Sequence, residues 1–297
     1  MRRRSMRTAG EDNALPGSPA GTEEKGVPMT VIAPSSAWQA FRLGEVWRYR
    51  ELLYFLAWRD VKVRYKQAVL GVLWALIQPF VRVVVFSLVF GGLAGIDSGG
   101  VPYAVFVYAG LLPWMFFADA VSRSGQSLVA GATILRKAYI PRLVMPLASA
   151  SAALFDYAIS FAVLLGLLVY YGLPWSTSLL LVLPLTLVTL LVALGVGLFA
   201  SALNAAYRDV QHVIPFLIQI WMFLTPVIYP ATAVPLRFRW LILVNPLTGI
   251  ISAYRAAILG GAVPWNQLGV SLGIAIALLT AGLAFFRSMD RYFADIV

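Results

Sequence analysis

The 297 residues are 60% hydrophobic and only 12% charged, and the mean hydropathy is +0.81. A soluble domain carries about twice that charged fraction, so the composition excludes an ordinary soluble protein and indicates an integral membrane protein. The net charge of +10 does not indicate nucleic-acid binding, because basic residues beside apolar runs usually set membrane topology and no basic stripe on a soluble fold is visible. The absence of cysteine excludes thiolate metal sites, and the single histidine, His212, argues against most histidine-based metal or acid–base sites.

The N-terminal part of the chain predicts two segments. Residues 1–35 begin with a cluster of arginines and continue without periodicity, so we expect a disordered cytoplasmic tail; no continuous apolar run follows that would make it a signal peptide. Residues 36–68 predict an amphipathic interfacial and connecting helix region. Within it, Arg59, Lys62 and Lys66 share one helix face, which forms a basic collar at the start of the first long apolar run.

Residues 69–290 predict a transmembrane domain of an all-α membrane protein. Each long apolar run has the length of about 20 residues that a helix needs to cross the hydrocarbon core. The six predicted spans lie near 69–94, 103–122, 146–171, 177–203, 212–229 and 266–286.

The distribution of Lys and Arg predicts the orientation. Basic residues gather before the first span, in the link 123–145, after the fourth span and in the tail, whereas the links after the first and third spans carry none. Both termini are therefore expected in the cytoplasm. The exception is the link 230–265, which carries Arg237, Arg239 and Arg255 and is partly apolar; we expect it to form re-entrant short helices at the outer side.

No catalytic apparatus is visible in the sequence. There is no G-x-x-x-x-G-K-[ST] phosphate loop, so the chain cannot bind ATP by that route, and no H-E-x-x-H motif or cluster of Asp, Glu and His residues suggests a membrane enzyme. We therefore expect a transport protein that holds no cofactor or metal of its own.

Three ionisable residues fall inside the predicted spans: Arg82, Asp119 and Asp156. A charge there is costly unless it is paired or hydrated. Arg82 could lie in a water-filled path and attract a phosphate or a sugar acid. Alternatively, Arg82 could pair with Asp156, since both lie at similar depth from the cytoplasmic edge, and this pairing is the favoured interpretation.

Aromatic residues are frequent in the first, second and fifth spans. Sugar rings stack on aromatic faces, so an aromatic-lined path would suit a polysaccharide, although interface belts and packing are the commoner roles of a single aromatic residue. The candidate path residues are Trp74, Gln78, Arg82, Phe106, Tyr108, Trp114, Phe117, Trp221 and Tyr229.

One proline-containing segment ends the fifth span, and a second lies within the outer link. T-P-V-I-Y-P, residues 225–230, breaks the fifth span before the outer surface, and N-P-L-T-G occupies residues 245–249. The freed backbone groups need partners inside protein or water, as at a gate, although a simple loop start is equally consistent. The candidate gate residues are Pro226, Pro230, Asn245 and Pro246.

The cytoplasmic link contains I-L-R-K-A-Y-I-P-R-L, residues 134–143. A short helix here could dock into a groove of a partner protein. The residues alone favour the other interpretation, which is an ordinary positively charged loop that anchors the topology.

An ordered set of motifs resembles the permease subunit of ABC-2 type exporters, in the branch that exports O-antigen, capsule or teichoic-acid chains. The similarity covers roughly residues 38–290. The motifs are W-R-D-V-K-V-R-Y-K-Q-A-V-L-G-V-L-W-A-L-I-Q-P at 58–79, Y-A-G-L-L-P-W-M-F-F at 108–117, Y-I-P-R at 139–142, L-N-A-A-Y-R-D-V at 203–210, and T-P-V-I-Y-P.

The resemblance implies a pore of two copies of this chain above two copies of a separate ATPase, which binds ATP and Mg. A lipid-linked polysaccharide would then move outward across the cytoplasmic (inner) membrane. The resemblance also implies that the interfacial helix and the link 123–145 contact the ATPase, which reverses the preference for a plain loop, and that the outer link forms gate helices. The candidate coupling residues are Arg48, Arg50, Arg59, Asp60, Lys62, Arg64, Lys66, Arg136, Lys137, Tyr139, Pro141 and Arg142.

Three alternative functions are weighed against this one. Within the exporter family, a drug or lipid exporter is the closest alternative. A secondary transporter often has related halves with broken helices at matching positions, and no such repeat is visible. A membrane glycosyltransferase or acyltransferase would need a carboxylate or histidine set at the membrane edge, and none is apparent.

Overall fold

The computed structural model describes residues 47–66, 71, 73–93, 95, 98–137 and 140–289. The chain divides into two units, 1–37 and 38–297, and all the described residues belong to the second unit. The predicted tail 1–35 and the start of the interfacial region therefore lie outside the described residues, as does Tyr139.

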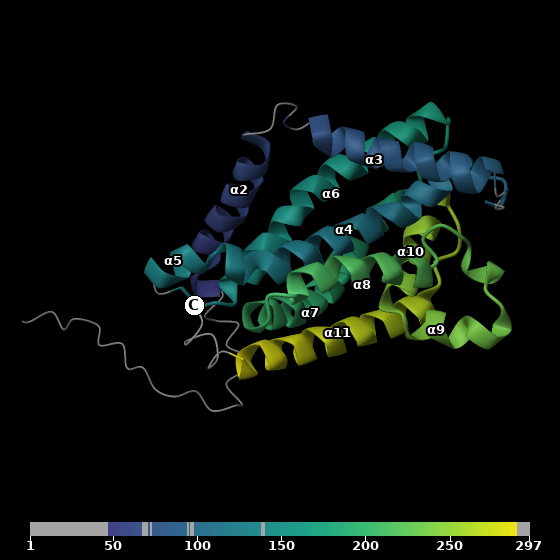
Figure 1. Ribbon diagram of the computed structural model, residues 1–297. Coiled ribbons are helices and arrows are strands. Elements are labelled where there is room, and N and C mark those ends of the chain that lie inside the picture. The colour runs from purple at the N-terminus through teal and green to yellow at the C-terminus, as the bar shows by residue number, and fades with distance from the viewer. Residues whose placement is uncertain are drawn as a thin grey trace, which may run out of the picture. The chain divides into compact units, whose positions relative to one another are not determined.

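The described regular elements are all helices (Figure 1). They are α2 (Arg50–Lys66), α3 (Leu73–Phe86), η2 (Ser87–Leu93), α4 (Tyr103–Ala130), α5 (Ala132–Lys137), α6 (Val144–Tyr170), η3 (Thr177–Leu181), α7 (Val182–Ala206), α8 (Val210–Leu224), η4 (Ala231–Ala233), η5 (Leu236–Phe238), α9 (Arg239–Val244), α10 (Pro246–Leu259) and α11 (Trp265–Ser288).

Five of these helical segments are long and apolar enough to cross a membrane. A sixth crossing is present if the segments Leu236–Val244 and Pro246–Leu259, which meet at a bend of 92°, count as one broken span. The five segments are Leu73–Leu93, Tyr103–Ala130, Val144–Tyr170, Thr177–Ala206 and Trp265–Ser288. The predicted all-α membrane fold is confirmed.

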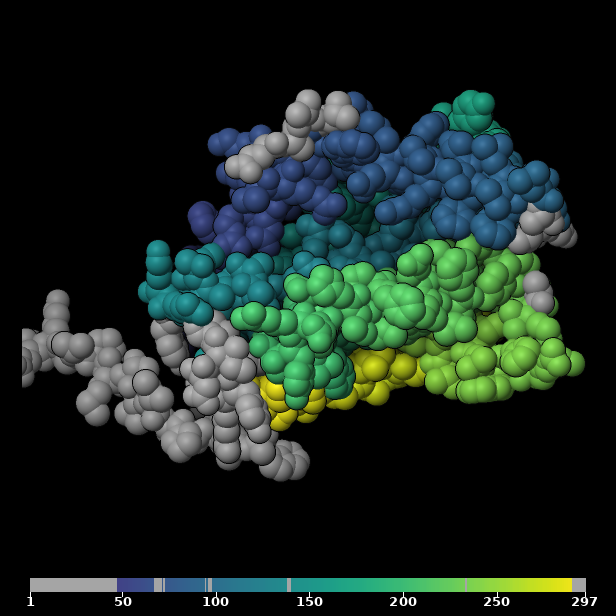
Figure 2. Space-filling model, in the orientation of Figure 1, coloured from purple at the N-terminus to yellow at the C-terminus, as the bar shows by residue number. Residues whose placement is uncertain are grey.

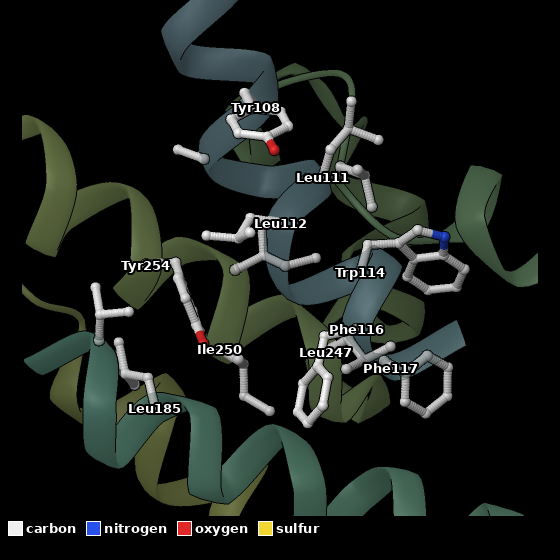
Figure 3. Packing of buried hydrophobic residues seen from close by; sticks show 14 of the residues in the cluster. Tyr108, Leu111, Leu112, Trp114, Phe116, Phe117, Leu185, Leu247, Ile250 and Tyr254 are labelled. Carbon is white, nitrogen blue, oxygen red and sulfur yellow. The ribbon is translucent and has the colours of Figure 1, made fainter. Parts of the chain in front are cut away.

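Helix α4 forms the centre of the fold. It packs against α6, α7 and α10, which surround it in Figure 1. The most apolar part of this helix is 83% buried, as expected for a helix that is apolar on all sides. Figure 3 shows aromatic and leucine side chains of α4 interlocking with Leu185 of α7 and with Leu247, Ile250 and Tyr254 of α10.

Two boundaries differ from those predicted. α4 continues to Ala130, eight residues past the predicted end at 122, because the charge of Arg123 is paired inside the protein and does not have to leave the helix. α8 ends at Leu224 after 15 residues, before the predicted end at 229. It therefore rises about 22 Å, less than the hydrocarbon thickness of about 30 Å. That α8 completes a span thus stays a prediction.

The outer link folds back into the protein. It contains η4, η5, α9 and the 14-residue helix α10, of which eleven residues are buried. α10 packs against α4, α7 and α11. The link therefore contains the short helices that the sequence predicts, and its second half lies among the long helices.

Helices α7 and α11 approach closely through glycine. A Cβ added to Gly195 would lie 2.7 Å from the carbonyl carbon of Leu278, and one added to Gly282 would collide with the carbonyl oxygen of Gly195. Small residues allow this contact between membrane helices. On the same helix, a Cβ at Gly273 would meet nothing within 4 Å.

We expect Gly282→Ala to destabilise the protein by about 1–3 kcal/mol, because the extra methyl group forces α7 and α11 apart. The measurement is the thermal unfolding midpoint in detergent. Gly273→Ala is the matched control and should be neutral or stabilising by up to about 1 kcal/mol, since alanine has the better helix propensity. Equal midpoints for the two variants would contradict the close crossing.

Candidate functional site

A cavity of about 770 Å³ lies between α3, α4, α6 and α8, with the end of α2 at its edge. In Figure 2, the blue surface of α3 and the green surface of α8 stand on either side of the teal surface of α4 and α6. Four predicted path residues line this cavity: Trp74, Gln78 and Arg82 of α3 and Trp114 of α4. The three residues of α3 are spaced four apart and so form one stripe along the helix.

A cluster of charged and hydroxyl side chains joins α2, α4 and α6 at the edge of the cavity. Asp156 of α6 is its centre: it accepts a hydrogen bond from Arg64 of α2 at 2.8 Å, and others from Tyr65 and Arg123. Arg123 also donates to Asp119, one turn earlier on α4, at 2.7 Å. Asp156 thus connects the three helices.

The favoured pairing of Arg82 with Asp156 is wrong. Asp156 pairs with Arg64 and Arg123, and in the part of the chain that the structure describes no carboxylate oxygen lies within 4.0 Å of the Arg82 guanidinium. The physical reason is that similar depth does not fix the rotation of a helix. Helix α2 places Arg64 beside the Asp156 carboxylate, and Arg82 remains exposed on α3.

The contact between α2 and α6, called the joint below, extends from the Asp156 cluster toward the start of α2. Asp60 accepts a hydrogen bond from Ser149 at 3.1 Å. The rings of Trp58 and Tyr65 lie 6.4 and 5.5 Å from the ring of Phe155. Helix α2 is therefore fixed to the long helix α6 along much of its length.

The predicted coupling residues separate into two groups in the structure. Most of the basic side chains are exposed. Arg64 is also partly exposed, but its guanidinium pairs with Asp156 of α6. Asp60 faces Ser149 and pairs with its neighbour Arg59 at 2.8 Å. The exposed residues are Arg48, Arg50, Lys62, Lys66, Arg136 and Lys137, and the half-buried ones are Pro141 and Arg142.

The remaining predicted path aromatics lie in packing contacts and do not line the cavity. Phe106, Tyr108 and Phe117 are buried, and the Tyr108 hydroxyl donates to the Ser160 carbonyl at 2.8 Å. Trp221 packs edge-on against Phe117 with ring centres 5.2 Å apart. Tyr229 donates to the carbonyl of Phe223 at 3.0 Å.

The predicted gate residue Asn245 connects the two proline-containing segments. Its side-chain oxygen accepts from the Leu247 N–H at 3.1 Å, so it caps α10, and Pro246 occupies the first turn of that helix. Its amide nitrogen donates to the Thr225 hydroxyl at 2.8 Å. Of the three gate prolines, Pro226 and Pro246 are buried and Pro230 is half-buried.

Arg255 is a site residue that the sequence interpretation missed. From α10, its guanidinium donates to the carbonyls of Pro226 at 3.0 Å, Val227 at 2.5 Å and Tyr229 at 3.3 Å. It also lies 3.9 Å above the centre of the Phe106 ring. The sequence feature that could have indicated its role is a single arginine within a short apolar stretch. Because its guanidinium binds backbone carbonyls inside the protein, Arg255 does not indicate on which side of the membrane the link lies.

A group of hydroxyls joins α10 to α6 and α7. The Thr186 hydroxyl lies 2.9 Å from that of Tyr157 and 2.8 Å from that of Tyr254, and the two tyrosine hydroxyls are 3.1 Å apart. Tyr157 also lines the cavity. Helix α10 is therefore linked by polar contacts to the cavity wall.

These features define the class of the protein. A bundle of long apolar helices with a cavity between them, a sharply bent and largely buried helix pair, and a preceding helix fixed by ion pairs is the arrangement of a membrane transport subunit. No group of three or more His, Asp or Glu residues that could hold a metal ion is present among residues 47–289 where they are described.

Residues 51–259 match the family of the ABC-2 type transporters. The match covers more than half of the chain, so the chain belongs to this family and is a multi-pass membrane permease. The phosphate loop is absent from its sequence, and the family implies a partner ATPase subunit.

Comparison with curated proteins gives relatives of the same kind. The chain is 29% identical over 248 residues, 83% of this chain and 95% of the relative, to "O-antigen export system permease protein RfbA" of Klebsiella pneumoniae. It is 29% identical over 255 residues to the protein of that name from Myxococcus xanthus, covering 84% and 97% of the two chains. It is 23% identical over 238 residues to "Polysialic acid transport protein KpsM" of Escherichia coli, covering 78% and 91%.

Proposed function

We propose that this permease forms the pore of an ATP-driven exporter that moves a lipid-linked polysaccharide, of O-antigen, capsule or teichoic-acid type, outward across the cytoplasmic membrane. Two copies of the chain would work with two copies of a separate ATPase that binds ATP and Mg. The names of the relatives support a polysaccharide substrate. The basic residues near the N-terminus and in the link 123–145 support cytoplasmic termini.

The observation that carries the proposal is the polar stripe on α3. Trp74, Gln78 and Arg82 line the cavity, yet all three are exposed in the single chain, and only 11% of the most apolar part of the segment Leu73–Leu93 is buried. A guanidinium near the middle of a span, with an amide one turn before it, is costly to expose to lipid, so this face favours contact with protein or water. A second copy that closes a hydrated, aromatic-lined path over the stripe supplies both.

The joint between α2 and α6 supports a path by which conformational changes of the ATPase could reach the cavity. The exposed cations of α2 and α5 form the surface for the ATPase, and Asp156 connects α2 to α4 and α6, which line the cavity. Movement of α2 would therefore change the walls of the path. Arg64 thus acts within the joint, whereas Lys62 and Lys66 remain candidates for direct contact with the ATPase. The segments around Pro226, Pro230, Asn245 and Pro246 form the outer gate.

Deletion of the gene tests this function. We expect lipid-linked polysaccharide to accumulate inside the cells and to disappear from their surface, as measured by extraction of the lipid-linked glycan and by surface labelling. A plasmid copy of the wild-type gene is the control and should restore export. Normal surface polysaccharide together with a selective sensitivity to drugs would contradict the proposal and favour a drug exporter.

A further inference from the structure

We propose that the cavity holds the phosphate group of a lipid at Arg82. This inference rests on the proposed export function, because it names the part of the substrate that the cavity would bind. The chemistry is that of a phosphate ester or diphosphate, and two sources can supply it: the diphosphate of a polyprenyl carrier or the headgroup of a bilayer phospholipid.

The first argument is the charge balance around the cavity. The cavity lining includes Arg64, Arg82, Asp119 and Asp156, and Arg123 is ion-paired to both carboxylates. Three arginines therefore face two carboxylates. Arg64 pairs with Asp156 at 2.8 Å, and Arg123 pairs with Asp119 at 2.7 Å. Within the described part of the chain, the surplus cation at the cavity is therefore Arg82.

The second argument is the depth of Arg82. It lies near the middle of the Leu73–Leu93 segment, and no described carboxylate oxygen lies within 4.0 Å of its guanidinium. An arginine without such an ion pair is costly in a bilayer and marks a functional position. A guanidinium offers a planar fork of donors that matches phosphate oxygens in pairs. An anionic ligand would thus complete the charge balance that the protein leaves open.

The third argument is the remaining lining of the cavity. Gln78, one helical turn before Arg82, and Gln219 of α8 supply neutral amide donors, and Trp74 supplies an indole N–H. Phe86, Met115 and Met222 line the same cavity and provide apolar surface. The site therefore combines one surplus cation and neutral donors with apolar walls, which suits a phosphate attached to a lipid or glycan better than a free, fully hydrated ion.

The test measures binding of radiolabelled undecaprenyl diphosphate to the full-length chain in nanodiscs of phosphatidylcholine. We expect Arg82→Gln to raise the dissociation constant about tenfold or more, because it removes a charge-assisted pair of hydrogen bonds. Arg82→Lys, which keeps the charge but loses the fork, should have a smaller effect. Arg239→Gln removes an exposed cation of α9 that does not line the cavity and should leave the affinity unchanged.

Wild-type affinity in Arg82→Gln would overturn the proposal. If Arg82→Gln fails to elute as a folded species in gel filtration, the comparison of Arg82→Lys with Arg239→Gln decides the question: equal affinities overturn the site, and a weaker Arg82→Lys supports it. Competition with phosphatidylglycerol distinguishes the sources, since displacement at equal concentration assigns the site to a bilayer phospholipid and resistance assigns it to the carrier.

The two proposals can fail separately. Loss of binding in Arg82→Gln, combined with normal surface polysaccharide after gene deletion, would refute the export function and leave the phosphate site standing. Unchanged binding in Arg82→Gln, combined with accumulated lipid-linked glycan after deletion, would refute the site and leave the export function standing.

Discussion

Replacement of Asp156 by asparagine is expected to lower the free energy of unfolding by about 3 kcal/mol and to release α2 from α6. The asparagine keeps the size of the side chain but leaves Arg64 and Arg123 without the carboxylate that they share. The figure is at the low end of that for a broken buried ion pair, because the Arg64 side chain is 42% exposed and Asp119 remains as a second partner.

Two measurements check this effect. The thermal unfolding midpoint in detergent reports the stability, and amide hydrogen exchange of residues 50–66 reports whether α2 stays attached. Asp209→Asn is the matched control, since Asp209 is an exposed carboxylate at the start of α8. If the Asp156 and Asp209 variants unfolded at the same temperature and α2 exchanged at the wild-type rate, Asp156 would not be the centre of the joint.

Replacement of Arg255 by methionine is expected to loosen the segment 225–230 and to cost about 3 kcal/mol. The change keeps an unbranched side chain but removes the donors to the carbonyls of Pro226, Val227 and Tyr229. Each lost hydrogen bond costs about 1 kcal/mol when the acceptor is left buried without a partner. The segment that is proposed as the outer gate would then lose its attachment to α10.

Hydrogen exchange locates this effect directly. The amides of Val227, Ile228 and Tyr229 should exchange faster in Arg255→Met, since the prolines at 226 and 230 have no N–H to report. Arg237→Met is the control in the same outer link, because Arg237 is exposed and lies over the ring of Phe238, with 4.8 Å to its centre. Protection at 227–229 equal to that of the control would show that Asn245 and Thr225 hold the segment without Arg255.

The long apolar runs of the sequence were sufficient to predict most of the fold. The second and sixth spans begin within one residue of α4 and α11, because length and hydropathy alone define a helix that crosses lipid. The end of α4 was predicted too early, at the first arginine. One carboxylate that accepts this charge, Asp119, lies only four residues earlier. The other, Asp156, lies 33 residues further along the chain, and a local pattern contains no information about that contact.

The part of the candidate site that lies on one face of a single helix was predictable from the sequence. Trp74, Gln78 and Arg82 recur every four residues, and the structure places them together on the cavity. Tyr108 and Phe117 belong to a helix that is apolar on all sides, so the sequence does not define which side faces a path. Arg255 was missed because its role consists of contacts with carbonyls 26 to 29 residues earlier in the chain.

The burial of α10 has a consequence for the biogenesis of the protein. With 14 residues, α10 is too short to cross lipid by itself, and it packs against α11, which is synthesised after it. A Cβ at Gly249 would lie 2.5 Å from the carbonyl oxygen of Gln267 on α11, so this contact needs both helices in place. We expect α10 to wait at the membrane surface or within the translocon until α11 has left the ribosome. Packing of α10 against α11 is then the last event of insertion.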